Sequence, residues 1–503
     1  MWLTGGWVLA LSPALAQERY RVDIPDFPGA LYSSDYGSVL AAPPPAGTRY
    51  RVEEPPQTDT FVAWEAIDAL GVQLWHDRGY TGKGVKVAVF DVQWLNAEVW
   101  EAELGDYTTH DCEASRSCEL PMDTLRPRFT WEEGSHGVAC AEVIRDLAPD
   151  AELHLVRVNG GTTLENAADW AAREGIDVVS MSMSFFSTSY YDGTGPINAV
   201  VDRLMAGGVL LVNSAGNYAT EHWDGDFRDD DLDGQHEFPW GSEYLPIYYG
   251  EGDHSVQILW DQYGRCGDTD FDIIAWDENA NIVGRSSARQ ATDADECSPQ
   301  ERLTLHAARA DWYYVQVLRV TGDPAVQFAI FARNGEVYEP TPGSIADPSS
   351  HPGSFSVGAV RADGYLINNA ESFSSEGPTH GGTPKPDIAG PDGLTTYTYG
   401  STGFYGTSAA TPAVAGAIVL MLEEDPRATP REAAARLAAN ALSGRSTWEP
   451  FDGELGAGRA RLPVGARRGC DSSAVGVAAL AGWTAALAPC LLWWLRRRPR
   501  GAD

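Results

Sequence analysis

Three short motifs, far apart in the sequence, carry an acid, a base and a nucleophile. Asp91 follows the apolar run VAVF, His136 stands in GSHGVACA, and Ser408 stands in GTSAATPAVAG. A serine hydroxyl is a poor nucleophile near neutral pH unless a base takes its proton, and a carboxylate can orient that base. The set therefore indicates acyl transfer, in which Ser408 attacks, His136 moves the proton and Asp91 orients the imidazole.

Each motif also has a structural interpretation when it is taken alone. An aspartate at a strand end is commonly a cap or turn residue, a single histidine at a helix start is commonly structural, and a serine can cap a packing helix. The small residues after Ser408 predict a helix deep in the core, with backbone N–H groups and the positive end of the helix dipole beside the serine. Such a helix start suits an oxyanion, so the catalytic interpretation is favoured for the set.

The elements around the motifs alternate between apolar runs and helix-like segments. Strands are expected at 85–90, 153–158, 178–183 and 209–212, and helices at 138–148, 164–174 and 199–206. Continuous β-branched runs between amphipathic helices predict a parallel sheet covered on both faces, an α/β fold of three layers. Asp91 then lies at the carboxyl end of a buried strand, where open α/β sheets build their sites.

The chain order Asp, His, Ser resembles that of the subtilisin-like serine peptidases (peptidase S8 family), rather than that of chymotrypsin or the α/β-hydrolases. The likeness covers about 75–218 and 355–461. It implies a subtilisin-like fold and a serine endopeptidase that hydrolyses proteins or peptides through an acyl-enzyme. It also implies that catalysis requires no cofactor.

The resemblance assigns further residues. Asn217 in SAGN is the expected oxyanion-hole donor, with the backbone N–H of Ser408 as its companion. Ser182, Met183 and Ser184 match the substrate-binding strand, whose backbone pairs with an extended peptide. The family usually has glycine where this chain has Ser184, which predicts a narrower pocket for the residue before the scissile bond.

Other residues next to the motifs also depart from the family pattern. Val92 and Gln93 follow the aspartate, Val138 follows His-Gly, and Ala409 follows the serine. These departures favour one alternative from another class, a catalytically silent subtilisin-like scaffold that acts as a surface binding protein. A protease that matures co-exported surface proteins is a third hypothesis.

Composition shifts divide the chain into six segments. Between the two catalytic segments, the acidic run 224–237 and the following strand-like alternation without helices predict an inserted β-sandwich-like domain. The expected segments are a signal peptide 1–16, a Pro-rich irregular extension 17–74, a first catalytic segment 75–220, the acidic β-rich insert 221–340, a second catalytic segment 341–465, and a C-terminal tail 469–503.

Both ends of the chain carry expected targeting signals. An apolar N-terminal stretch that ends in an A-x-A-like site predicts a signal peptide and export. This stretch lacks the usual positive charge, so a misassigned start codon is the alternative. Uncharged residues 472–495, followed by an arginine cluster, predict a transmembrane helix, with a buried helix as the alternative. With Cys470 before it, this tail resembles the sorting tails of myxobacterial surface proteins. The expected location is the cell surface or outer envelope, anchored by the tail or released after processing.

The net charge limits the classes of molecule that the protein could bind. A net charge of −35 argues against nucleic acid, because phosphates would be repelled, and it also keeps an exported protein soluble. The predicted partners are protein or peptide substrates and a membrane, which the tail would contact. The sequence does not indicate an oligomeric state.

Two pairs of cysteines are expected to form disulfides, and one further cysteine is expected to remain a buried thiol. The expected pairs are Cys112 with Cys118 and Cys266 with Cys297, and the thiol is Cys140.

One acidic segment has a spacing that suits a metal ion. Asp229, Asp231 and Asp233 alternate before a glycine, as at the start of an EF-hand-like calcium loop, but no glutamate stands at the twelfth position. Oxygen ligands at this spacing suit a hard cation, so a structural Ca²⁺ is expected. A solvated acidic loop is the alternative.

Overall fold

The structure, a computed structural model, describes residues 62–95, 97, 101–123, 134–263, 269–289, 299–322, 325–443 and 452–464, with the backbone of 31–32 and 38–40. Nearly all belong to one compact unit, Met1–Leu462, and the rest to a second, Pro463–Asp503. Among the described helices, none is long and apolar enough to cross a membrane. The predicted signal peptide, the segment 472–495, Cys266, Cys297 and Cys470 lie outside the described residues.

A seven-stranded parallel sheet forms the centre of the larger unit. In spatial order its strands are β19 (Ile388–Asp392), β18 (Phe355–Arg361), β8 (Leu210–Ser214), β6 (Val178–Met181), β3 (Lys86–Asp91), β5 (Glu152–Arg157) and β4 (Tyr107–Asp111). The inner strands β8, β6, β3 and β5 are buried on both faces along nearly their whole length, as the sequence predicts for strands between two helical layers, whereas the edge strand β4 is only partly buried. All neighbouring pairs are parallel, so the carboxyl ends of these strands share one edge.

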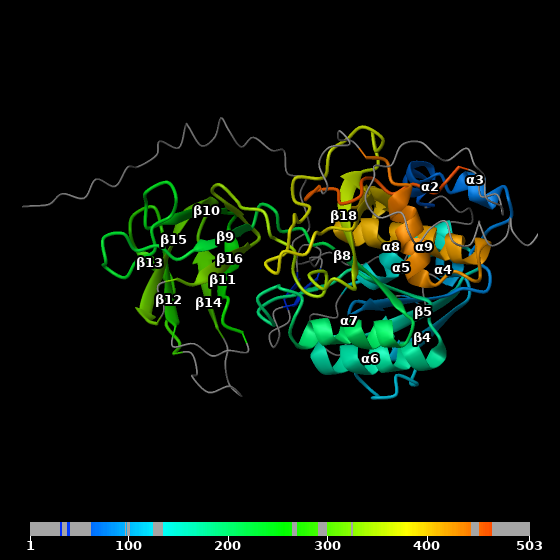
Figure 1. The fold of residues 1–503 in the computed structure, drawn as a ribbon, viewed down its shortest axis with the longest axis horizontal. Coiled ribbons are helices and arrows are strands. Elements are labelled where there is room, and N and C mark those ends of the chain that lie inside the picture. The colour runs from blue at the N-terminus through cyan, green and yellow to red at the C-terminus, as the bar shows by residue number, and fades with distance from the viewer. Residues whose placement is uncertain are drawn as a thin grey trace, which may run out of the picture. The chain divides into compact units, whose positions relative to one another are not determined.

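Helices cover both faces of this sheet (Figure 1). Alternate residues of β3 point to opposite sides: Val87 and Val89 join the core beneath α5 and α8, whereas Ala88 and Phe90 join the core beneath α6 and α7. The α/β fold with a parallel sheet is therefore confirmed. The helices are α2 (Trp64–Leu70), α3 (Gln73–His76), α4 (Glu101–Leu104), α5 (His136–Leu147), α6 (Gly161–Glu174), α7 (Pro196–Ala206), α8 (Thr407–Glu424) and α9 (Pro430–Ala439).

Between β8 and β18 the chain forms two antiparallel sheets. The strands in order are β13 (Ile282–Ser286), β12 (Asp270–Trp276), β15 (Asp311–Thr321), β10 (Leu245–Tyr249) and β17 (Gly335–Val337) in one sheet, and β14 (Gln300–Ala307), β11 (Gly252–Trp260), β16 (Gln327–Arg333) and β9 (His222–Asp226) in the other. Strand β14 alternates buried and exposed residues, as a strand with one covered face does. Both sheets contribute to one buried apolar cluster.

Arg333 joins these sheets to the region around the parallel sheet. The side chain is 1% exposed, lies 4.4 Å from the ring centres of both Phe186 and Tyr218, and forms an ion pair of 3.0 Å with Glu221. Cation–π contacts of a desolvated guanidinium are among the stronger ones. Because Phe186 directly follows β7 (Ser184–Phe185), this contact lies beside the predicted substrate strand.

The expectation of an irregular extension over 17–74 is wrong at its end, where α2 forms and α3 begins. Ala66, Ile67 and Leu70 of α2 are buried in the core that α5 and α8 share, and Gly71 ends the helix in the left-handed region. A seven-residue helix has too few turns for its amphipathic pattern to stand out beside the prolines that precede it. The helix therefore gains its stability from tertiary packing.

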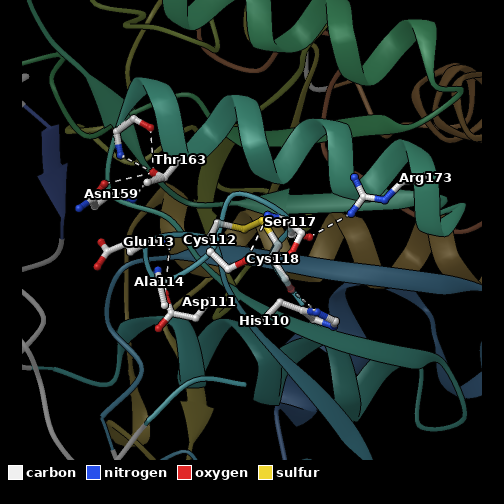
Figure 2. Close-up of a disulfide and its surroundings, with 12 residues drawn as sticks. His110, Asp111, Cys112, Glu113, Ala114, Ser117, Cys118, Asn159, Thr163 and Arg173 are labelled. Carbon is white, nitrogen blue, oxygen red and sulfur yellow. Dashed lines mark hydrogen bonds between the residues drawn. A yellow bond between two sulfur atoms is a disulfide. The ribbon is translucent and has the colours of Figure 1, made fainter. Parts of the chain in front are cut away.

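The predicted disulfide between Cys112 and Cys118 is present and closes the turn after β4 (Figure 2). The Asp111 carboxylate accepts the backbone N–H groups of Glu113 and Ala114, and the Arg173 guanidinium donates to the Ser117 carbonyl. These bonds give the turn one conformation at the sheet edge where β3 ends. Cys140 is the predicted buried free thiol.

Candidate active site

Asp91 is the last residue of β3 and is completely buried. One carboxylate oxygen accepts the backbone N–H groups of Val92 (2.8 Å) and Gln93 (2.9 Å), and the other accepts Nδ1–H of His136 at 2.7 Å. Charge-assisted hydrogen bonds of this kind compensate a buried carboxylate. The residues that depart from the family pattern after Asp91 therefore still supply the backbone donors that orient it.

His136 is the first residue of α5, and its ring is held on one side by Asp91. A Cβ on Gly137 would lie 2.7 Å from Cβ of Asp91, so only glycine lets the helix start this close to β3. The ring of Phe404 lies edge-on to the imidazole at 5.9 Å. Nε2 is buried and bonds to no group in the described chain, which leaves its lone pair available as a base.

Ser408 is the second residue of α8 and is partly exposed, whereas its neighbours Thr407 and Ala409 are buried. Its carbonyl lacks the usual helical donor because Pro412, four residues on, has no N–H. The hydroxyl of Ser182 donates to that carbonyl at 3.0 Å, and the Cys140 sulfur lies 3.7 Å from it. The residue after β6 and the helix that begins with His136 thus both contact the Ser408 backbone.

The Cys140 thiol lies close to two of the three predicted catalytic residues, Asp91 and His136. Its sulfur, a ring nitrogen of His136 and a carboxylate oxygen of Asp91 are all within 4.8 Å of one another. Within the described chain, no hydrogen bond joins the Ser408 hydroxyl to Nε2 of His136. Such contacts are often long without substrate and tighten in the Michaelis complex. The residue set suits a nucleophile with its base and orienting carboxylate.

Asn217 follows β8 and lies against the turn before Ser408. Its Oδ1 accepts both the backbone N–H (3.0 Å) and the hydroxyl (2.9 Å) of Thr407, which determines the orientation of the amide. Gly406 has a φ of +94°, and a Cβ there would lie 2.9 Å from Nδ2 of Asn217. Glycine at this position leaves room for the amide, whose N–H groups then suit an oxyanion.

Asn217→Asp is expected to lower kcat by about 10²- to 10³-fold with little change in KM. Aspartate keeps the oxygen that accepts from Thr407, so the turn is preserved, but it replaces the Nδ2 donor with an acceptor that repels the developing oxyanion. Steady-state kinetics on a peptide substrate test this expectation. A higher KM with an unchanged kcat would show instead that Asn217 binds the ground state.

The predicted substrate strand is split in two. Strand β6 ends at Met181, the side chain of Ser182 supports Ser408, and Ser184 begins β7. The backbone of β2 (Ser38–Leu40) pairs antiparallel with β7 and in turn with β1 (Leu31–Tyr32). The edge at Ser184 therefore accepts an added extended strand, here one from the same chain.

Two carboxyl groups at this site were not among the predicted residues. Glu142 of α5 accepts the backbone N–H and hydroxyl of Thr398, in the turn between β20 (Leu394–Thr396) and β21 (Gly400–Phe404). Asp392 ends β19 and accepts the backbone N–H of Gly406 at 2.9 Å. An acidic residue inside an otherwise apolar segment was the available signal for both.

Asp392→Asn is expected to stabilise the protein more at pH 8 than at pH 5. Burial, and after it the charge of Glu371, raises the pKa of Asp392 to about 7. An unfolded aspartate titrates near 4, so the free energy of unfolding falls as the pH rises from about 4 to about 7. Asparagine still accepts from Gly406 without a charge, and we expect Tm to rise by roughly 5 °C at pH 8.

Thermal unfolding at both pH values tests this expectation, with Asp363→Asn as a control on an exposed carboxylate. The control is expected to leave Tm unchanged at both pH values. Equal shifts for Asp392→Asn at pH 5 and pH 8 would contradict the buried-charge explanation.

Comparison with known proteins identifies the family of the chain and a similar fold. The subtilase family (Peptidase_S8) matches residues 82–239 and 273–466, well over half of the chain. The minor extracellular protease Vpr of Bacillus subtilis is 27% identical over 194 residues, which cover 35% of this chain and 24% of that protein. Subtilisin E of Bacillus subtilis is 33% identical over 168 residues, which cover 30% of this chain and 39% of that protein.

The structure of the Clostridium perfringens CspB protease has a similar fold, with a TM-score of 0.56 at 16% identity over 80% of this chain and 98% of that chain. The chain spans only about a quarter to two fifths of the length of the two curated relatives. From the family match, the chain belongs to the subtilase family.

Proposed function

We propose that this protein is a serine endopeptidase that hydrolyses peptide bonds in proteins or peptides through an acyl-enzyme. The observation that carries the proposal is the buried Asp91–His136 pair, 2.7 Å apart, at the carboxyl edge of the sheet beside the helix that begins with Thr407 and Ser408. Membership of the subtilase family supports the same reaction.

In this proposal, the Ser408 hydroxyl attacks the peptide carbonyl while Nε2 of His136 takes its proton. Asp91 stabilises the imidazolium through Nδ1, and Nδ2 of Asn217 with the Ser408 N–H binds the oxyanion. His136 then protonates the leaving amine, and the C–N bond breaks to give the acyl-enzyme. Water, deprotonated by His136, attacks the ester, and Ser408 recovers its proton. No cofactor takes part.

Substrate backbone is proposed to pair with the edge at Ser182, Met183 and Ser184. The pairing of β2 with β7 supports this, because it is the antiparallel addition that an extended peptide would make. Side chains from this edge are largely buried, and Ser184 is 2% exposed. We therefore expect main-chain recognition to dominate, with small residues preferred before the scissile bond.

The segment 221–340 is proposed to be a β-sandwich domain inserted into the catalytic domain. Two antiparallel sheets with one shared apolar cluster support this, and the family match is interrupted at 240–272, within the same segment. Export is supported by a similar relative whose name describes an extracellular protease. Anchoring by the C-terminal tail remains part of the proposal.

Hydrolysis of casein by the purified full chain tests the proposed activity. Wild type is expected to cleave casein, and a serine-reactive inhibitor or Ser408→Ala is expected to abolish cleavage. A folded wild type without activity on any protein substrate would favour the alternative, a silent scaffold that binds at the surface. The complete burial of His136 is the observation that favours this alternative.

A further inference from the structure

A loop between the two sheets of segment 221–340 brings three carboxylates together. It runs from the end of β9 in one sheet to the start of β10 in the other. One carboxylate oxygen from each of Asp229, Asp231 and Asp233 lies within 4.8 Å of the others. Like charges this close repel, so the arrangement requires compensation.

Asp229 supplies a second, independent observation. Its side chain is only 5% exposed, and Oδ2 bonds to Nη2 of Arg319 at 3.0 Å. The other oxygen, Oδ1, is buried and has no hydrogen-bond partner in the described chain. An ionised oxygen without a partner is costly to bury. A cation bound to Oδ1 would satisfy it.

Glu243, just before β10, adds a fourth carboxylate. Its Oε2 accepts from the Gln316 amide at 3.3 Å. The same Gln316 amide donates to Oε1 of Gln235, whose Nε2 donates to Oδ2 of Asp233, so two amide side chains connect the Glu243 and Asp233 carboxylates. Of these four carboxylates, only Asp229 forms an ion pair among the described residues, with Arg319.

The loop backbone is fixed before any ion binds. Gly234 accepts the N–H of Arg319 at 2.8 Å, and His236 donates to the Val317 carbonyl at 2.9 Å, so β15 holds the loop. Gly234 has a φ of +89°, which lets the chain turn directly after Asp233. Acidic residues at the first, third and fifth positions with glycine at the sixth are typical of a calcium loop.

We propose that Asp229, Asp231, Asp233 and Glu243 bind one Ca²⁺. Glu243 supplies the carboxylate that an EF-hand takes from its twelfth position. Calcium fits better than magnesium, because calcium accepts many carboxylate oxygens in irregular geometry, whereas magnesium retains water and demands an octahedron. The ion would tie the crossover between the two sheets to β15, and its role is stability of the segment rather than chemistry at Ser408.

Calorimetric titration of the full chain with CaCl₂, after removal of metal by a chelator, tests the site. The Ser408→Ala background prevents self-digestion and separates this test from the proposed peptidase activity. We expect one equivalent of Ca²⁺ to bind and Tm to rise by roughly 5 °C in saturating Ca²⁺. Asp231→Asn and Glu243→Gln are each expected to weaken binding by at least about 10-fold.

Asp230→Asn is the matched control. Asp230 is in the same loop and carries the same charge, but its carboxylate pairs with Arg228 at 3.3 Å and is 68% exposed. We expect it to change the affinity by less than about 2-fold, because the charge is exposed and already paired. The proposal is wrong if the folded protein takes up no Ca²⁺ at millimolar concentration, if Asp230→Asn weakens binding as much as Asp231→Asn, or if Mg²⁺ binds equally well.

Discussion

Alanine at Ser408 or at His136 is expected to lower kcat on a peptide substrate by about 10⁶-fold, and the double variant is expected to lower it no further. The two residues act as one unit, because the hydroxyl is a useful nucleophile only while Nε2 of His136 takes its proton. The Nε2 lone pair bonds to no described group, so it is available for that role. Single-turnover kinetics of the two single variants and the double variant measure the coupling.

Stability must be measured beside activity, because His136 is completely buried. Ser408→Ala removes only a partly exposed hydroxyl, so we expect Tm to stay within about 2 °C of wild type. If the losses from Ser408→Ala and His136→Ala instead added in free energy, the two residues would act independently and the proposed proton transfer would be contradicted.

Asp91→Asn is expected to lower kcat by about 10⁴-fold near neutral pH. Asp91 accepts Nδ1–H of His136 and so selects the tautomer whose Nε2 is a base. An asparagine amide turned toward Nδ1 would donate instead, which selects the opposite tautomer and places the proton on Nε2. The variant keeps an acceptor for the backbone N–H groups of Val92 and Gln93, so the fold should persist.

Asp111→Asn is the matched control for this substitution. Asp111 also ends a strand of the parallel sheet, is completely buried and accepts two backbone N–H groups from the following turn. Its ion pair with Arg157 is structural, so we expect the control to lower Tm and leave the pH profile of kcat unchanged. An equal loss of kcat in both variants would mean that Asp91 supports the fold rather than the imidazole.

Much of the fold could be predicted from the sequence because local pattern and tertiary environment agree there. The run VAVF before Asp91 is apolar on both faces, and β3 is indeed covered on both faces by helices. The small residues of GTSAATPAVAG likewise allow α8 to lie in the core, and Gly416 approaches Leu147 of α5 closely. In both segments the residue types themselves indicate that the element is buried.

Other features depend on partners that are distant in the sequence. Asp392 and Thr407 gain their roles from Gly406 and Asn217, and no local pattern identifies such pairs. The alternation of β14 indicates a strand, but its partner is not identifiable from that pattern, and the structure pairs it with β11. In each of these cases tertiary contacts, rather than local propensity, determine the partner.

Reaction with a fluorophosphonate probe tests the central claim most directly, because the probe forms a covalent bond only with a serine that a base activates. The full-length wild type is expected to be labelled, with the adduct mapped by mass spectrometry to Ser408, while His136→Ala is expected to remain unlabelled although it retains that serine. A folded wild type that takes up no label, or a label on another serine, would contradict a catalytic unit of Asp91, His136 and Ser408.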